Sequence, residues 1–312
     1  MSEPKIILLC SSRFAIPAIR ELHFYKLLSA VVIPGYCEDM LEQSAMFLKD
    51  TDVAMLVVDK ENCDTIVANA ITEHSITMGV VMSFPYKITA AVFNLPQAGF
   101  FNVHPGPLPA YRGADPVFQQ IRKREKYAGV TIHKIDEGLD TGALVLQEMI
   151  KLEVTDTYGL LTTKLSVLAG KMTGTLTRLA SMDIAIPSRK QDETKAVYYK
   201  KQLAKDITIN WNIMDAVTIT ALANACNPWN KGVVTKLNGN IIRLLEVESM
   251  EAGTGLKQRA GTIVSLREDS MLIATLNDEA VKVKIIYIEE GFLLPGRLRG
   301  LGVAEGNCFE MV

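Results

Sequence analysis

The first 150 residues alternate short apolar runs, rich in β-branched residues, with segments of helical periodicity. Expected strands and helices follow one another in the order Lys5–Ser12, Ile16–Phe24, Leu28–Ile33, Asp39–Leu48, Ala54–Val58 and Cys63–Thr72. Further strands are expected at Met78–Phe84 and Gly99–Val103. Strands that are apolar along their whole length need cover on both faces, which helical crossovers provide. The pattern therefore predicts a doubly wound α/β fold with a mainly parallel sheet.

The second part of the chain changes from helical to β periodicity. A long amphipathic helix is expected at Tyr158–Met182, and a second helix at Ile213–Cys226. Five short strands follow, and the first two are separated by Asn238-Gly239, a strong hairpin signal. Short strands at this spacing predict a small OB-like β-barrel. The expected organisation is an α/β domain at residues 1–186, a polar linker at residues 187–205 and the β-barrel domain at residues 206–312.

The composition of the 312-residue chain is that of a globular protein, with 48% hydrophobic residues and a formal charge of −2. Neither part of the chain has the basic excess of a nucleic-acid-binding arm. We find no secretory signal and no apolar run long enough to span a membrane, so a cytoplasmic location without a membrane partner is expected. The five cysteines lack any C-x-x-C spacing, which predicts reduced thiols and no metal site.

Several common site motifs are missing from the sequence. The turn after the first strand, Cys10–Phe14, lacks the glycine fingerprint of dinucleotide-binding proteins, so NAD is disfavoured. The pair Gly170-Lys171 lies inside an expected helix and is followed by methionine, which excludes a P-loop. Neither a zinc-protease H-E-x-x-H nor a G-x-S-x-G elbow occurs. A nicotinamide oxidoreductase is therefore suggested by fold analogy alone.

Polar residues gather after the carboxyl end of the expected strand Gly99–Val103. Asn102 and His104 are two residues apart, so they leave an extended chain on the same face. After the next expected strand, Gly129–His133, the loop Asp136–Gly142 carries a cluster of carboxylates that includes Asp140. Ligands of open α/β sheets bind at the carboxyl ends of the strands. We therefore expect Asn102, His104 and Asp140 to meet in one pocket.

An amide, an imidazole and a carboxylate without a Ser or Cys nucleophile suit direct acyl transfer to an amine. The imidazole would take or relay the amine proton, and the amide would donate to the developing oxyanion. The carboxylate would fix the tautomer and charge of the histidine. The same residue types also fit a structural interpretation, with a loop histidine, a turn-forming asparagine and a solvated aspartate.

These motifs resemble those of the 10-formyltetrahydrofolate-dependent formyltransferases, especially the methionyl-tRNA formyltransferases and their amino-sugar-nucleotide relatives. The matching segments, in the order of that family, are Asn102–His104, Leu108–Gly113, Gly129–His133, Asp136–Gly142, Ile209–Trp211 and Asn227–Gly232. The resemblance implies a formyltransferase-type Rossmann-like domain, a C-terminal OB-like barrel and 10-formyltetrahydrofolate as co-substrate. It also implies that Asn102, His104 and Asp140 are the catalytic residues.

The resemblance further implies a folate pocket between the stretch Ser83–Ile88 and the loop Asp136–Gly142. The residues expected to contact the folate are Ser83, Phe84, Tyr86, Ile88, Leu108, Asp136 and Gly138. Phe84 and Tyr86 fit equally well as core aromatics, since aromatics in apolar strands usually pack in the interior. Strand alternation places His133 opposite Ile132, so His133 is expected to be structural.

Two departures from the family bear on the acceptor. The chain has only Pro34–Cys37 where the tRNA enzymes carry a longer basic loop, and Pro105–Pro109 replaces the usual wall segment. These departures favour a small-molecule or amino-sugar-nucleotide amine over methionyl-tRNA as acceptor. Methionyl-tRNA formyltransferase is the first alternative function. The second is a non-catalytic protein that binds folate, an oligonucleotide or a sugar.

Overall fold

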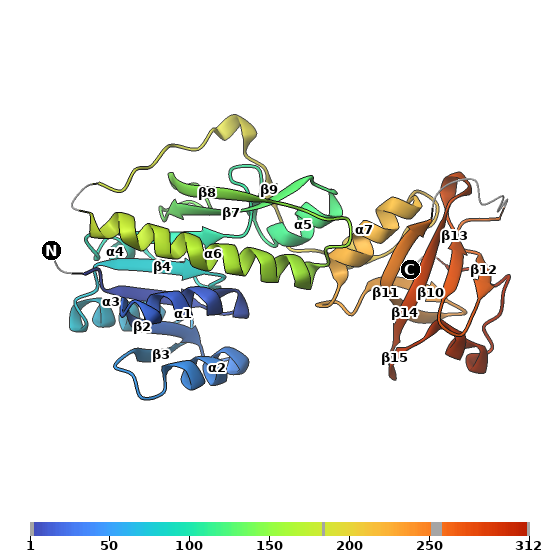
Figure 1. The fold of residues 1–312 in the computed structure, drawn as a ribbon, viewed down its shortest axis with the longest axis horizontal. Helices are drawn as coiled ribbons and strands as arrows, with labels where there is room; N and C mark the ends of the chain where they lie inside the picture. The colour runs from blue at the N-terminus through green and yellow to red at the C-terminus, as the bar shows by residue number, and fades with distance from the viewer. Residues whose placement is uncertain (1–2, 183–184, 251–257, 311–312) are drawn as a thin grey trace. The chain divides into compact units, whose positions relative to one another are not determined.

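The computed structural model describes residues 3–182, 185–250 and 258–310 (Figure 1). The chain divides into two compact units, each with most of its contacts inside itself. The first, here called the α/β unit, comprises Met1–Pro116, Tyr127–Ile150 and Thr162–Tyr199. The second, the barrel unit, comprises Val117–Lys126, Lys151–Leu161 and Lys200–Val312.

The α/β unit is built on a seven-stranded sheet with the order β3-β2-β1-β4-β5-β7-β8. The strands are β1 (Ile6–Cys10), β2 (Leu28–Pro34), β3 (Ala54–Val58), β4 (Met78–Met82), β5 (Phe100–His104), β7 (Tyr127–Lys134) and β8 (Leu144–Lys151). The first five strands in this order pair in parallel, whereas β7 runs antiparallel to β5. The prediction of a mainly parallel sheet is confirmed. The periodicity did not predict β8, whose residues are mostly half-buried or exposed.

Helices cover both faces of this sheet. The helices of this unit are α1 (Ile16–Phe24), α2 (Glu38–Leu48), α3 (Cys63–Glu73), α4 (Ala90–Phe93) and most of α6 (Tyr158–Ser181). Helix α5 (Pro116–Arg122) belongs to the barrel unit except for its first residue. Figure 1 shows α1 and α6 on the same side of the sheet, and a Cβ at Gly170 of α6 would lie 2.9 Å from Pro17 of α1. Residues 35–37 alone connect β2 to α2. The expected short connection is therefore present.

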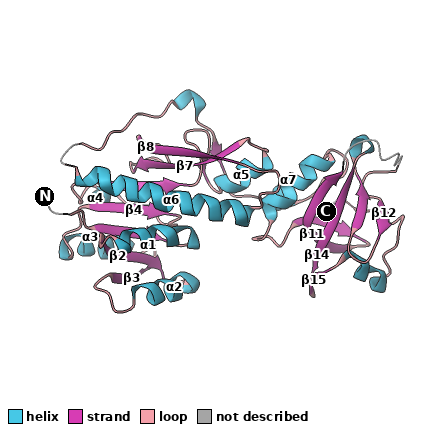
Figure 2. Ribbon diagram, in the orientation of Figure 1, coloured by secondary structure: helices cyan, strands magenta, loops and turns pink. Residues whose placement is uncertain are grey.

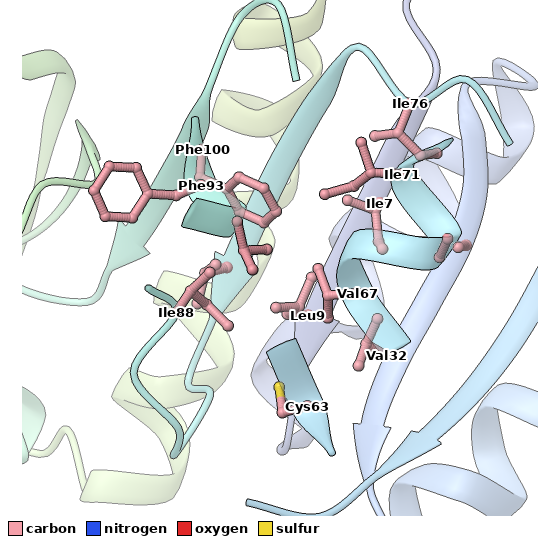
Figure 3. Close-up of a cluster of buried hydrophobic side chains, with 14 of the residues drawn as sticks. Ile7, Leu9, Val32, Cys63, Val67, Ile71, Ile76, Ile88, Phe93 and Phe100 are labelled. Carbon is pink, nitrogen blue, oxygen red and sulfur yellow. The ribbon is translucent and has the colours of Figure 1, made fainter. Parts of the chain in front are cut away.

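The opposite face of the sheet packs on a buried apolar cluster (Figure 3). Ile7 and Leu9 of β1 meet Val67 and Ile71 of α3 in this cluster. Ile88, from the segment after β4, is 4% exposed and belongs to the same cluster. Burial of such side chains contributes about 25 cal/mol per Å² of apolar surface, so the cluster fixes the segment that carries Ile88.

The barrel unit contains α7 (Ala216–Cys226), cyan in Figure 2, and an antiparallel sheet, magenta in Figure 2. The strand order of this sheet is β10-β11-β14-β13-β12. The strands are β10 (Val233–Leu237), β11 (Asn240–Met250), β12 (Ile263–Leu266), β13 (Met271–Ala274), β14 (Ala280–Ile288) and β15 (Gly291–Leu293), which pairs with β14. The C-terminal segment forms β-bridges to both edges of this sheet. Glu310 bridges to Lys236 of β10, and Cys308 bridges to Thr262, which directly precedes β12. The expected fold class, an α/β sheet followed by a small β-barrel, is therefore confirmed.

Local signals explain how the barrel unit is built. The side chain of Asp215 accepts a hydrogen bond from the Thr218 N–H, which caps the start of α7. Asn238 and Gly239 both have positive φ, 50° and 81°, as a type I′ hairpin turn between β10 and β11 requires. No helix in the described part of the chain is long and apolar enough to cross a membrane.

Candidate active site

The predicted site residues come together because β5 and β7 are antiparallel neighbours. Asn102 lies directly opposite His133 in the register, and His104 lies opposite Thr131. The loop after β7 then turns back and carries Asp140 to the end of β5. Asp140 has a φ of +56°, a left-handed conformation that aspartate tolerates better than most residues.

The three predicted catalytic side chains meet at Asp140. The Asn102 amide Nδ2 donates to Asp140 Oδ1 over 3.3 Å, and His104 Nδ1 lies 3.8 Å from the same oxygen. His104 and Asp140 are both buried, with exposures of 5% and 7%. The convergence that the sequence analysis expected is therefore present in the structure.

The protonation of His104 follows from its contact with the main chain. His104 Nε2 lies 2.6 Å from the carbonyl oxygen of Tyr111, and a carbonyl can only accept, so Nε2 carries the proton. Burial lowers the pKa of His104, and this effect outweighs the opposing effect of Asp140. His104 is thus a neutral imidazole whose basic Nδ1 faces Asp140. The expected tautomer-fixing role of Asp140 belongs instead to the Tyr111 carbonyl, because that carbonyl is the nearer partner.

Asp140 stays ionised although it is buried. Burial by itself would raise the pKa of its carboxyl group, but a hydrogen bond with His133 and the nearby His104 act in the opposite direction. The Gly113 N–H also donates to Asp140 Oδ2 over 2.9 Å. Together these contacts lower the pKa of Asp140 to about 2. The cluster therefore combines a fixed negative charge with a neutral base.

His133 is part of this cluster, although the sequence analysis expected a structural residue. Its Nε2 lies 3.1 Å from Asn102 Nδ2 and 3.5 Å from Asp140 Oδ1, and its Nδ1 lies 2.8 Å from the Lys134 carbonyl oxygen. Strand alternation gave the correct pleat, but it could not show that β7 pairs antiparallel with β5. That pairing puts the face of β7 that carries His133 beside Asn102.

A cavity of about 300 Å³ opens beside the cluster. Asn102, His133 and Asp140 line it together with five residues predicted to contact folate, namely Phe84, Tyr86, Ile88, Asp136 and Gly138. The rings of Phe84 and Tyr86 meet edge to face at 5.4 Å, and both side chains also pack against the apolar cluster of Figure 3. Lys87 Nζ donates to the Glu137 carbonyl over 2.9 Å, which ties the two wall segments together.

Three predicted site residues lie outside the wall of this cavity. The Ser83 carbonyl accepts a hydrogen bond from the Ser11 hydroxyl. Leu108 is buried, its N–H bound to Thr131 Oγ1 at 3.1 Å and its carbonyl to Gln147 Nε2 at 2.8 Å. His104 contacts the cavity through Asp140 rather than directly. Ser83 and Leu108 are thus not in the lining of this cavity, and their contact with the folate stays a prediction.

We find no group of three His, Cys, Asp or Glu side chains within residues 3–182, 185–250 and 258–310 that could hold a metal ion. All five cysteines are free thiols. A buried base, a buried carboxylate and an amide donor beside a cavity with apolar walls can bind a planar ligand and move a proton.

Models of known protein families match both parts of the chain. The model described as formyl transferase matches residues 42–174, and the model of the formyl transferase C-terminal domain matches residues 203–298. The methionyl-tRNA formyltransferase of Caldicellulosiruptor saccharolyticus is 32% identical over 233 residues, which are 74% of this chain and 73% of that protein. That of Halothermothrix orenii is 31% identical over 207 residues, or 65% of each chain.

Solved structures share the fold at low sequence identity. HypX from Aquifex aeolicus in complex with tetrahydrofolic acid has a TM-score of 0.64 at 19% identity, over 96% of this chain and 47% of that chain. An N-formyltransferase from Helicobacter canadensis, in complex with folinic acid and dTDP-3-aminofucose, has a TM-score of 0.66 at 14% identity. That match covers 90% of this chain and 99% of the other.

The family matches define the class of protein as a group-transfer enzyme. The two family matches and the relative at 32% identity show that the chain belongs to the formyl transferases. The predictions of this family and of an enzyme that transfers formyl groups are confirmed.

Proposed function

We propose that this chain transfers a formyl group from 10-formyltetrahydrofolate directly to a primary amine. The observation that carries the proposal is the contact of Asn102, His104 and Asp140 beside a cavity walled by aromatic and acidic residues. Family membership supports a formylated tetrahydrofolate as donor, as does the tetrahydrofolate bound by the HypX structure.

The proposed reaction balances without a covalent enzyme intermediate. The amine nitrogen attacks the formyl carbon, and Asn102 Nδ2 donates to the oxygen that becomes negative. The amine proton reaches the basic Nδ1 of His104 by way of Asp140, which lines the cavity, and the Asp140 charge stabilises the resulting imidazolium. The bond between the formyl carbon and folate N10 then breaks, and the proton passes to N10.

The folate is proposed to lie between the Phe84–Ile88 segment and the Asp136–Asp140 loop. Phe84, Tyr86 and Ile88 would cover its apolar ring faces, while polar groups of the loop would meet the ring edges. The apolar cluster below these side chains keeps this wall in place before the ligand arrives. Pre-formed walls reduce the ordering cost of binding.

A small-molecule or amino-sugar-nucleotide amine is the acceptor that we propose first. The connection between β2 and α2 is only residues 35–37, and α2 begins with the acidic pair Glu38 and Asp39. Such a turn offers little to the phosphates of a tRNA, which proteins neutralise with Lys and Arg. Methionyl-tRNA is the second candidate, and it is favoured by the relatives at 31–32% identity that are named for it.

One assay separates these candidates. The enzyme is incubated with 10-formyltetrahydrofolate and a panel of amines, and tetrahydrofolate release is followed. The panel contains amino-sugar nucleotides, free amino sugars, amino acids and charged initiator tRNA. Turnover with an amino-sugar nucleotide or another small amine supports the first acceptor class, whereas turnover with charged initiator tRNA alone reverses the order.

The same preparation tests the non-catalytic alternative. Calorimetry with 5-formyltetrahydrofolate reports folate binding whether or not a formyl group is transferred. Binding without transfer to any amine of the panel would support a folate-binding protein and refute the proposed reaction.

A further inference from the structure

A second polar network lies directly behind Asp140, and it is centred on the fully buried side chain of Arg112. The Arg112 guanidinium donates to Gln191 Oε1 over 3.1 and 2.8 Å and to the Glu193 carboxylate over 2.8 and 2.6 Å. It also donates to the Tyr198 hydroxyl over 2.9 Å. This fork-like arrangement of donors fixes the planes of its partners as well as their positions. Gln191 and Glu193 are therefore held in one geometry.

Gln191 connects this network to the candidate active site. While its Oε1 accepts from Arg112, its Nε2 donates to the carbonyl oxygen of Asp140 over 2.7 Å and to that of Gly142 over 2.8 Å. Both ends of one amide are thus engaged, and both acceptors belong to the loop that carries the Asp140 carboxylate.

The loop that Gln191 holds has an unusual backbone. Asp140 has a φ of +56°, and a Cβ at Gly142 would lie 1.8 Å from the Lys134 carbonyl oxygen. A left-handed conformation is disfavoured for a non-glycine residue in isolation, so surrounding contacts must hold it. The two hydrogen bonds from Gln191 are contacts of this kind.

The segment that carries Gln191 also holds the other side of the cluster. Strand β9 (Tyr198–Tyr199) pairs in parallel with β6 (Arg112–Gly113), and the rings of Tyr111 and Tyr199 stack at 5.4 Å. The Tyr111 carbonyl accepts from His104, and the Gly113 N–H donates to Asp140. Residues 191–199 therefore contact both segments that position the candidate catalytic side chains.

We infer that Gln191 is a positioning residue that holds Asp140 in its left-handed conformation and keeps its carboxylate directed at Asn102 and His104. Arg112 and Glu193 keep the Gln191 amide in the orientation that this needs. The inference rests on the proposed function, because it assigns Gln191 an effect on the reaction through Asp140. Gln191 itself is placed behind the loop and does not touch the reacting atoms.

The variant Gln191→Glu separates positioning from simple packing. Glutamate has nearly the same shape and can still accept from Arg112, but it has no N–H to donate to the carbonyls of Asp140 and Gly142. Lys190→Leu, at the exposed residue next to it, is the matched control. We expect Gln191→Glu to lower kcat about 10²-fold, the size of effect that a displacement of about 1 Å produces. The affinity for 5-formyltetrahydrofolate and the melting temperature should fall, relative to the control, far less than kcat does.

Histidine NMR gives a second measurement that does not depend on the acceptor. The chain has four histidines, so ¹⁵N-histidine labelling yields four rings that can be assigned by substitution. In Gln191→Glu the signals of His104 and His133 should shift and the titration of His104 should change, whereas those of His23 and His74 should not move. Lys190→Leu should leave all four unchanged.

The outcomes distinguish failure of this inference from failure of the proposed function. Unchanged kcat and unchanged His104 and His133 signals in a folded Gln191→Glu variant would overturn the positioning role. So would a loss of kcat matched by an equal loss of folate affinity and of melting temperature. If the unsubstituted enzyme formylates no amine, the proposed function fails, and the histidine signals still decide whether Gln191 positions Asp140.

Discussion

Replacing Asp140 by asparagine removes the fixed charge of the candidate active site with little change in shape. An asparagine at position 140 keeps an oxygen that can accept from the Gly113 N–H. It cannot supply the negative charge that the His104 imidazolium needs when it holds the amine proton. The substitution therefore tests the charge of Asp140 rather than its volume.

The size of the effect follows from one distance. For unit charges separated by the 3.8 Å between Asp140 Oδ1 and His104 Nδ1, an effective dielectric constant of about 20 gives an interaction of ~4 kcal/mol. Each 1.36 kcal/mol of lost transition-state stabilisation is a factor of ten in rate. We therefore expect kcat of Asp140→Asn to fall roughly 10³-fold.

The assay is tetrahydrofolate release with the best acceptor of the amine panel, run at saturating 10-formyltetrahydrofolate. Calorimetry with 5-formyltetrahydrofolate serves as the control for folding and donor binding. A folded Asp140→Asn variant that binds the folate and keeps more than a tenth of the original kcat would refute the electrostatic reasoning.

Three further predictions concern stability and reactivity. Burial lowers the pKa of His104 in the folded chain, whereas in the unfolded chain the pKa of this imidazole is about 6.5. Below about pH 6.5 the unfolded chain therefore binds a proton more readily than the folded chain, so the unfolding free energy should decrease as the pH falls. Urea unfolding at several pH values should show this decrease, and His104→Asn should weaken it. Gly142→Ala places a Cβ 1.8 Å from the Lys134 carbonyl oxygen, so the unfolding free energy measured in urea should fall by about 1–3 kcal/mol. The affinity for 5-formyltetrahydrofolate, measured by calorimetry, should fall as well. Of the five thiols, only the half-buried Cys37 and Cys308 should react with Ellman's reagent in the native protein at pH 8, and all five in denaturant.

Much of the architecture follows from local sequence signals. The apolar runs of β1, β2 and β4 indicated the parallel sheet, because strands that are buried on both faces cannot alternate with polar residues. The helix expected at Tyr158–Met182 is α6 to within one residue, and the Asn238-Gly239 turn is where the hairpin needs positive φ. In each case the information lies within a few neighbouring residues.

The parts that could not be predicted depend on pairing between distant segments. His133 joins the cluster through the antiparallel register of β7 with β5, which no periodicity reports. Gln191 and Glu193 lie in residues 187–205, a polar stretch whose composition predicts a linker, yet they bind Arg112 and the Asp140 loop. Polar side chains in an irregular segment carry no periodic signal, so only the folded structure shows their partners.

The tautomer of His104 illustrates the same limit at a single atom. Residue types suggested a carboxylate partner, but the acceptor at Nε2 is the Tyr111 carbonyl. Every residue except proline offers the same main-chain donor and acceptor, so sequence cannot single out one carbonyl among its neighbours.

The most direct measurement is a crystal structure of the enzyme with the unreactive donor analogue 5-formyltetrahydrofolate. The ring system should occupy the cavity between Tyr86 and the Asp136–Asp140 loop, with the N10 side of the folate directed at Asn102 and Asp140. A folate bound elsewhere, or bound with N10 far from Asn102 and Asp140, would contradict the account.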